Sequence, residues 1–300
     1  MNRSKSLILV IAALLLSLPS TQAQQKKKPK PTAAPPGTTV LRDLPYTHFQ
    51  KDEIQLLLDL YRPEKFEGEL PVVLWVHGGG WKNGSKDRCK AAWLATKGFA
   101  VASINYRLIG SGVWPDQIND CRKAVRWLKK NAHMYGLSKT EYGAWGGSAG
   151  GHLVALMGTL PYEKNEAISS RVKAICDWYG PSDLLTMPPN MVANGRTEED
   201  VAKSNGARLL GVTVKDDVPR AKSASAFWQV SSDDSAFLIM HGDKDPGVPI
   251  AQSEKLHKKL QAHGVRSKFH VVKGAGHGGK EFQTEEAQSL ILDFFNRELK

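Results

Sequence analysis

The segment that most restricts the fold of this chain is a serine framed by glycines, Gly146-Gly147-Ser148-Ala149-Gly150. It follows the strand-like run 140–145 and precedes the helix-like run 152–158. A G-x-S-x-G serine between a strand and a helix is typical of a nucleophile elbow, a sharp turn that lifts the hydroxyl clear of a sheet. A side chain two positions before or after the serine would collide with a neighbouring element, and glycine at both positions removes the collision. The segment predicts a reactive serine; a glycine-rich turn with an incidental serine is the alternative.

A second glycine-rich segment stands earlier in the chain, where the apolar run 71–76 ends in His77-Gly78-Gly79-Gly80-Trp81. Consecutive glycines let backbone amides approach a substrate oxygen closely. The helix that begins after Ser148 adds further amides, because its first N–H groups have no partner inside the helix. Both segments could therefore supply donors that stabilise an oxyanion.

Two later loops carry the polar side chains that a serine nucleophile needs. The apolar run 237–240 leads into His241-Gly242-Asp243-Lys244-Asp245, and the run 269–272 leads into Gly274-Ala275-Gly276-His277. Serine, aspartate and histidine thus occur in that order, each just past the carboxyl end of a predicted strand. We expect the three side chains to meet at one edge of a sheet.

Together these motifs resemble those of α/β-hydrolases of the HGGGW esterase type. They are similar to the hormone-sensitive-lipase-like carboxylesterases and, more closely, to the bacterial esterases grouped as bifunctional feruloyl and acetyl xylan esterases. The resemblance covers about residues 41–300 and implies a mostly parallel central sheet flanked by helices, with a cap insertion. One difference stands in the cap, where relatives often carry Ala-Ser-Pro and this chain has Ala224-Ser225-Ala226.

His277 is the predicted base that takes the proton of Ser148, since a serine hydroxyl alone is a poor nucleophile. It lies in a short glycine-flanked loop after the last predicted strand, as the order of the triad requires. The competing histidines fall in the oxyanion loop, the core, the acid loop or a helix away from the strand ends, and they are His77, His152, His241, His257 and His263.

The acid that orients His277 is less narrowly defined by the sequence. Asp245 matches the position that the resemblance assigns within H-G-x-x-D. Asp243 could reach outward from the same loop, although an aspartate in such a turn often bonds its own backbone. Asp183 is a third candidate with a structural role as the simpler interpretation. We favour Asp245.

The resemblance also implies the groups around the reacting carbonyl. The oxyanion hole is expected to consist of the amides of Gly79, Gly80 and Ala149. Trp81 is expected to line the substrate pocket, with plain core packing as the alternative. No metal-ligand spacing is present, and no metal or cofactor is expected.

The N-terminus predicts export. Arg3 and Lys5 precede the apolar stretch 7–18, and a small-residue site ends at Ala23, so residues 1–23 read as a signal peptide of a secreted or periplasmic protein. The stretch is shorter than the roughly 20 apolar residues of a membrane-spanning helix. We therefore expect no stable membrane span after cleavage, with an uncleaved anchor as the alternative.

Residues 24–39 are predicted to form an extended linker, because they combine four prolines with Lys26, Lys27, Lys28 and Lys30. These lysines contribute much of the formal net charge of +11. A basic tail can bind acidic polymers. No basic and aromatic pattern of a nucleic-acid-binding module accompanies it, so no nucleic acid is expected as a partner.

From residue 40 to residue 300 the pattern alternates strands and helices, which predicts one α/β domain. Strands are expected at 55–61, 72–76, 100–105, 140–145, 172–179, 237–240 and 268–272, and helices at 91–97, 116–132, 152–158, 250–263 and 281–299. The segment of about 183–232 interrupts this alternation, and we expect it to cover the site as a cap. The three cysteines allow at most one disulfide.

The leading functional hypothesis is a secreted serine carboxylesterase that works through an acyl-enzyme on short acyl esters, acetyl or feruloyl, of small molecules or carbohydrate. An amide-cleaving relative, an arylformamidase or small peptidase, is the enzymatic alternative. A non-catalytic binding protein on the same scaffold is the third, and the intact serine, acid and histidine argue against it. The sequence leaves the oligomeric state open.

Overall fold

The computed structural model describes residues 30–49, 54–162, 167–193 and 195–300. The predicted signal peptide and the lysine run 26–28 lie outside the described residues. Within the described chain, eight strands form one sheet in the order β1-β2-β4-β3-β5-β6-β7-β8. The strands are β1 (Thr38–Phe49), β2 (Ile54–Pro63), β3 (Leu70–Val76), β4 (Ala100–Ile104), β5 (Leu137–Gly147), β6 (Ala174–Trp178), β7 (Ala236–Gly242) and β8 (Ser267–Val272).

The sheet is parallel from β4 to β8, whereas β1 and β2 pair antiparallel at one edge. Strand β3 is buried along its whole length, which explains its unbroken apolar sequence. Such a strand needs cover on both faces of the sheet. The predicted α/β class with a mostly parallel sheet is confirmed.

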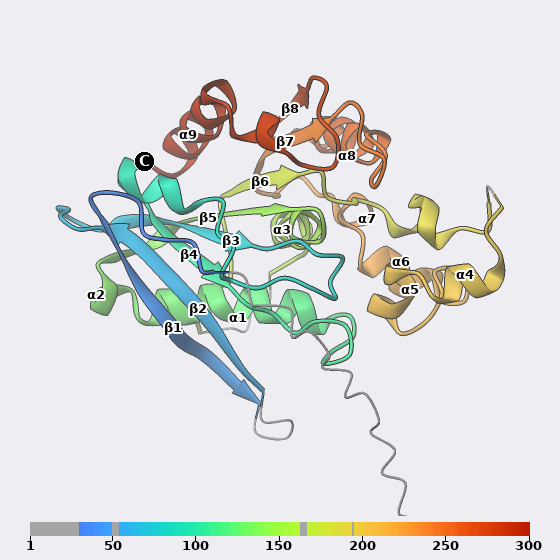
Figure 1. Cartoon of the computed structure of the whole chain (residues 1–300), viewed down its shortest axis with the longest axis horizontal. Helices are drawn as coiled ribbons and strands as arrows, with labels where there is room; N and C mark the ends of the chain where they lie inside the picture. Colours follow the sequence, from blue (N-terminus) through green and yellow to red (C-terminus); the bar gives the residue numbers. More distant parts are fainter. Residues whose placement is uncertain (1–29, 50–53, 163–166, 194) are drawn as a thin grey trace, which may run out of the picture.

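Helices cover both faces of this sheet, with α1 below it and α9 above it in Figure 1. One core joins the sheet to α1 (Asp116–Lys130), α3 (Ala149–Thr159) and α8 (Ala251–Ala262), and the other joins it to η2 (Ala92–Lys97) and α9 (Glu285–Leu299). Side chains of β3 alternate between the two cores, with Leu74 in the first and Trp75 in the second. The short helix α2 (Ala132–Tyr135) follows α1.

Two predicted helices differ from the structure. The segment 91–97 forms the 3-10 helix η2 rather than an α-helix. The predicted helix 281–299 is divided into η5 (Lys280–Gln283) and α9, because Thr284 lies between them as the N-cap of α9. Its hydroxyl accepts a hydrogen bond from the amide of Ala287 at 3.3 Å and so begins a new helix.

The linker prediction is wrong for residues 30–39, because this stretch packs on the body of the protein. The amide and the hydroxyl of Thr32 donate to the carbonyl of Asp87 at 2.8 and 2.9 Å. The same hydroxyl accepts from the amide of Cys89 at 3.1 Å. Strand β1 then begins at Thr38, inside the predicted linker. Paired backbone groups hold a segment that its composition alone predicts to be extended.

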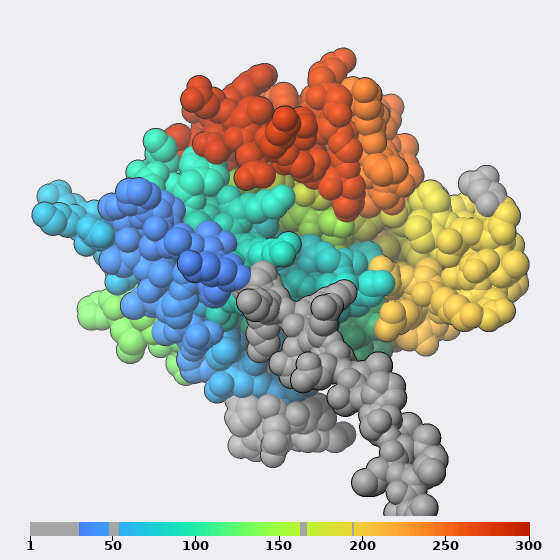
Figure 2. All heavy atoms as spheres, viewed as in Figure 1, coloured from blue at the N-terminus to red at the C-terminus, as the bar shows by residue number. Residues whose placement is uncertain are grey.

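The segment between β6 and β7 forms a lobe beside the body, coloured yellow to orange in Figures 1 and 2. It is tied to the body by the carbonyl of Leu209, which accepts from the amide of Trp114 at 2.8 Å. Its short helices are η3 (Leu184–Thr186), η4 (Pro188–Asn190), α4 (Glu198–Ala202), α5 (Asn205–Leu210), α6 (Val218–Ser223) and α7 (Ala226–Gln229).

All three cysteines lie within the described chain, where Cys89, Cys121 and Cys176 are buried and unpaired. Burial raises the pKa of the Cys89 thiol to about 12, so this thiol stays protonated. Among the helices that the structure describes, none combines the length and the apolar character that crossing a membrane requires.

Candidate active site

Ser148 stands at the tip of a strained turn between β5 and α3. Its φ of 57° and ψ of −121° are unusual for a residue with a side chain. A Cβ atom at Gly150 would lie 2.0 Å from the carbonyl oxygen of Val76, and one at Gly146 would lie 2.5 Å from the backbone of Gly150. Only glycine fits at either position, so the predicted steric reason for the G-x-S-x-G pattern is confirmed.

The structure brings Ser148, His277 and Asp245 into one hydrogen-bonded chain. Ser148 Oγ lies 2.8 Å from His277 Nε2, and His277 Nδ1 lies 2.7 Å from Asp245 Oδ2. A carboxylate can only accept, so Nδ1 carries the proton and Nε2 is free to accept from the serine hydroxyl. This is the arrangement in which an imidazole can take the proton of a nucleophilic serine.

Asp245 is buried and fully engaged. Its Oδ1 accepts from the amides of Gly247 at 2.7 Å and Val248 at 2.9 Å, and its Oδ2 lies 3.3 Å from His241 Nε2. Burial alone would raise the pKa of Asp245, but hydrogen bonds from His241, His277 and these amides hold it well below its usual range. Asp245 is therefore ionised near neutral pH and faces His277 as a carboxylate.

The two other candidate acids lie elsewhere. Asp243 points away from His277, and its Oδ1 accepts from the amide of Gly274 at 2.7 Å. It thereby fastens the start of the loop that carries His277. Asp183, at the start of the lobe, pairs with Lys255 of α8 at 2.5 Å, in line with its structural interpretation.

The glycine loop after β3 lies directly against the serine turn. A Cβ atom at Gly78 would lie 2.6 Å from the carbonyl oxygen of Gly147. Gly79 and Gly80 line the cavity that contains Ser148, and in the described chain no acceptor contacts their amides. Ala149 is the first residue of α3, where amides have no partner within the helix. The structure thus places all three predicted oxyanion donors around Ser148.

His77 fixes the shape of this glycine loop. Its Nδ1 lies 2.8 Å from the carbonyl oxygen of Gly78, and its ring stacks on Tyr106 with centroids 4.4 Å apart. Burial lowers the pKa of His77 to about 4. The ring is therefore neutral near pH 7, and its Nδ1–H donates to the loop.

Trp81 does not line the pocket, contrary to expectation. It has a φ of 59°, which turns its side chain from the cavity into the core, where it is 6% exposed. Its Nε1 donates to His152 Nδ1 at 3.2 Å, and His152 Nε2 lies 2.7 Å from the carbonyl oxygen of Ala224 in the lobe. Trp81 and His152 thus connect the glycine loop, α3 and the lobe.

The hydrogen bonds of His152 require its neutral form. A proton on Nδ1 would face the N–H of Trp81, and burial lowers the pKa of His152 from 6.5 to about 4. Below about pH 6.5, His152 binds a proton in the unfolded protein but stays neutral in the native state. The stabilisation that the neutral His152 provides is therefore lost as the pH falls from about 6.5 towards 4. We expect the advantage of wild type over His152→Gln in free energy of unfolding to shrink by about 2 kcal/mol between pH 7.5 and pH 5.

Urea unfolding of both proteins across this pH range measures the difference. His133→Gln provides the control, since His133 is exposed at the other end of the sheet. A constant difference between wild type and His152→Gln at all pH values would contradict a neutral, buried His152.

The cavity that contains Ser148 and His277 has a volume of about 1010 Å³. Loops that follow strands β3, β4, β5, β6 and β8 form it, and no described residue of 183–232 is among its lining residues. The described residues of the lobe therefore lie beside this cavity without lining it. The lobe approaches the site at Gly80, where a Cβ atom would lie 2.6 Å from Asn205 Nδ2.

Tyr179 is a site residue that the sequence analysis did not single out. It directly follows β6 with a φ of 44°, lines the cavity, and packs on His277 with ring centroids 4.8 Å apart. The strand predicted at 172–179 includes it, whereas β6 ends at Trp178, so its position past a strand end was not visible from the sequence. Tyr179 thereby limits the movement of the imidazole.

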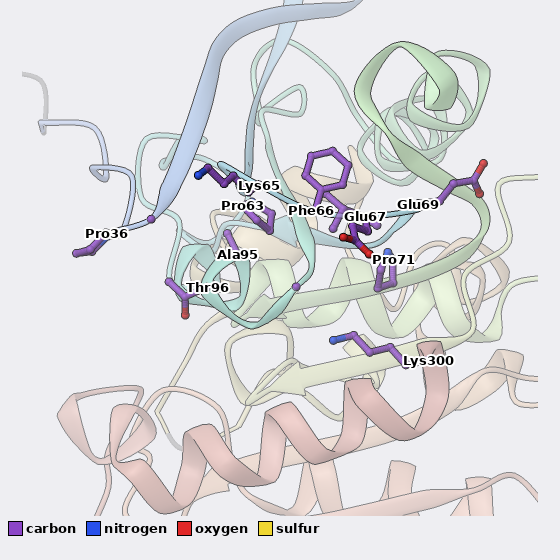
Figure 3. Close-up of a pocket in the computed structure, with 13 residues that line it drawn as sticks. Pro36, Pro63, Lys65, Phe66, Glu67, Glu69, Pro71, Ala95, Thr96 and Lys300 are labelled. Carbon is purple, nitrogen blue, oxygen red and sulfur yellow. The ribbon is translucent and has the colours of Figure 1, made fainter.

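A second cavity, of about 640 Å³, lies near the start of β3 at Leu70 and Pro71 (Figure 3). It is therefore at the opposite end of the strand from Ser148. Side chains of both charges line it, including Lys65, Glu67 and Lys300. None of its lining residues is a histidine.

The sheet, with a serine turn after β5, an aspartate after β7 and a histidine after β8, is that of an α/β-hydrolase. Residues 58–260 match the model of the BD-FAE family. The chain belongs to this family.

Curated relatives include enzymes named for esters and for amides. Esterase LipC of Mycobacterium tuberculosis is 28% identical over 274 residues, which cover 83% of this chain and 64% of that protein. Kynurenine formamidase of Danio rerio is 25% identical over 245 residues, covering 80% and 75%. The chain spans 64%, 46% and 53% of the lengths of three mycobacterial relatives, LipC, LipM and LipQ.

Two solved structures share the fold closely. A truncated carbohydrate esterase from gut microbiota superposes with a TM-score of 0.76 at 28% identity, over 90% of this chain and 99% of that one. A bifunctional GH43-CE protein of Bacteroides eggerthii gives a TM-score of 0.76 at 31% identity, over 87% of this chain and 35% of that one.

Proposed function

We propose that this protein is a serine carboxylesterase that removes short acyl groups, acetyl or feruloyl, from esters of carbohydrate. The hydrogen-bonded chain from Ser148 through His277 to Asp245, open to a large cavity, carries this proposal. The names of the esterase relative and of the carbohydrate esterase with the same fold support the class of substrate.

In the acylation step, Ser148 Oγ attacks the ester carbonyl while His277 Nε2 takes the hydroxyl proton. Asp245 stabilises the resulting imidazolium through Nδ1–H. The amides of Gly79, Gly80 and Ala149 stabilise the negative oxygen of the tetrahedral intermediate. His277 then gives its proton to the departing alcohol oxygen, and the acyl group remains on Ser148.

In the deacylation step, His277 acts again as a base. It takes a proton from water, whose oxygen attacks the acyl carbonyl within the same oxyanion hole. Collapse of the intermediate breaks the bond to Ser148 Oγ, which recovers a proton from His277. The neutral imidazole at the start of each step is the form that the contact with Asp245 stabilises.

The cavity wall favours a polar alcohol over a long fatty chain. Asn83, Ser85 and Asn105 are among its lining residues, beside the aromatic Trp75 and Tyr179, so the wall offers polar groups as well as apolar surface. Added methylenes gain binding energy only where apolar surface can bury them. A sugar ring with a short acyl group suits such a wall better than a lipid does.

We expect specificity constants for 4-nitrophenyl esters to fall once the acyl chain exceeds about six carbons. A chain-length series from acetate to decanoate measures this, and acetate release from acetylated xylan tests the polysaccharide. Rising values out to long chains would contradict the short-acyl proposal. Turnover of small acetyl esters without acetate release from xylan would support the esterase activity but contradict xylan as a substrate.

An amide-cleaving activity is the second candidate, because a kynurenine formamidase and a dipeptidyl aminopeptidase of Pseudoxanthomonas mexicana are among the relatives. The same serine chemistry acts on both bonds. Assaying N-formylkynurenine beside the acetyl esters separates the two candidates by their specificity constants.

We also propose export by a signal peptide cleaved after Ala23, supported by the charged start, the apolar stretch and the small-residue site. N-terminal sequencing of secreted protein tests this. A membrane-extracted product that begins at Met1 would favour an anchor instead.

A further inference from the structure

The loop from 83 to 90, between β3 and η2, forms one wall of the cavity that contains Ser148. It brings two basic side chains, Arg88 and Lys90, to this wall, and both are exposed. The reaction mechanism uses the triad and the backbone of the glycine loop, and it does not use the charges of this wall. These charges are therefore candidate determinants of substrate preference.

Lys90 is held close to the catalytic residues by an aromatic contact. Its Nζ lies 5.6 Å from the centre of the Trp178 ring. The carbonyl of Trp178 accepts from the amide of Ser148 at 2.8 Å, and the next residue, Tyr179, packs on His277. Lys90 therefore lines the same cavity as Ser148 and His277.

Neither basic side chain has a carboxylate partner in the described part of the chain. The carboxylate that precedes them on this wall, Asp87, accepts from Ser85 Oγ at 3.0 Å and from Lys86 Nζ at 3.4 Å. On the same loop, by contrast, Lys86 is paired with Asp59 at 2.7 Å. Among the described residues, Arg88 and Lys90 are thus not paired directly with a carboxylate, although Asp87 lines the same cavity.

Two neighbouring cations repel each other, and a bound anion relieves that repulsion. Desolvation and the charge of Arg88 both lower the pKa of Lys90. A carboxylate between the two side chains would accept charge-assisted hydrogen bonds from both. A neutral ester provides no negative charge to Arg88 and Lys90.

We propose that Arg88 and Lys90 bind a carboxylate carried by the substrate, so that acidic esters are preferred over neutral ones. The inference rests on the esterase function proposed above. The carboxylate could belong to the acyl group, as in a dicarboxylic acid monoester, or to the alcohol, as in a uronic acid. The chemistry of recognition is the same in both cases, and two pairs of substrates distinguish them.

The acyl arm compares the 4-nitrophenyl monoester of adipic acid with 4-nitrophenyl methyl adipate. The alcohol arm compares the O-acetylated methyl glycosides of glucuronic acid and glucose, with acetate release as the readout. We expect wild type to favour the acidic member of at least one pair in kcat/KM. This ratio should fall roughly fivefold in Lys90→Gln and in Arg88→Gln, and rising salt should reduce it.

Lys90→Arg should keep the ratio, because the positive charge remains. Lys82→Gln is the matched control, since Lys82 is exposed on the same loop region but does not line the cavity. The inference is overturned if wild type shows no acidic preference in either arm, or if Lys82→Gln lowers the ratio as much as Lys90→Gln. Failure to hydrolyse the neutral esters as well would instead overturn the esterase function itself.

Discussion

Replacing Ser148 with alanine should lower kcat on acetyl esters by roughly a thousandfold or more while leaving the fold intact. The hydroxyl is the atom that lies 2.8 Å from His277 Nε2. Without it, only the oxyanion donors and substrate binding remain. The strained backbone of the turn is unaffected by the change, because alanine keeps the same Cβ atom. Steady-state kinetics and thermal melting measure the two effects separately.

A phosphonate ester probe adds a readout that does not depend on turnover. Mass spectrometry of wild type should show one covalent adduct, which Ser148→Ala lacks. Ser111→Ala is the matched control, because Ser111 is exposed and lies outside the cavity. Esterase activity close to wild type in the Ser148 variant, or an unchanged adduct, would show that another residue is the nucleophile.

The sequence was sufficient to predict the position of Ser148, Asp245 and His277, for a physical reason. Each follows a strand of a parallel sheet, and the carboxyl ends of such strands meet at one edge. Because each motif follows a predicted strand, the three loops could be expected to meet at that edge. The preference for Asp245 over Asp243 rested on the resemblance alone, and the structure adds the directions of the two side chains, which a shared turn does not reveal.

Trp81 shows where sequence patterns stop being informative. Its place after three glycines suggested the pocket, but its own φ of 59° turns the ring towards His152 instead. A left-handed conformation at a tryptophan is unusual, and no periodicity indicates it. The same limit applies to the lobe at 183–232, whose length suggested a cap but not the side on which it packs.

The first strand was missed because its alternation is interrupted. The pairing of β1 with β2 shifts register between Leu41 and Leu44 and again between Pro45 and Thr47. Asp43 adopts a φ of 56° within the first of these irregularities. Each register shift interrupts the alternation of apolar and polar side chains that identifies a strand, so the sequence of this segment does not predict one.

Replacing Asp245 with asparagine should cut kcat/KM by several orders of magnitude, with little change in melting temperature. The asparagine oxygen can still accept from the amides of Gly247 and Val248, which hold the side chain in place. Its NH2 group then faces His277 Nδ1 and forces that nitrogen to accept. The proton moves to Nε2, and the imidazole can no longer take the proton of Ser148.

Asp243→Asn is the matched control, since it makes the same change two residues away. Its side-chain oxygen can keep the 2.7 Å contact with the amide of Gly274, so we expect a lower melting temperature at most and kcat/KM within about tenfold of wild type. Kinetics and melting curves of both variants decide between the two carboxylates. Severe loss of turnover in the Asp243 variant, with near-normal turnover in the Asp245 variant, would reverse the assignment of the acid.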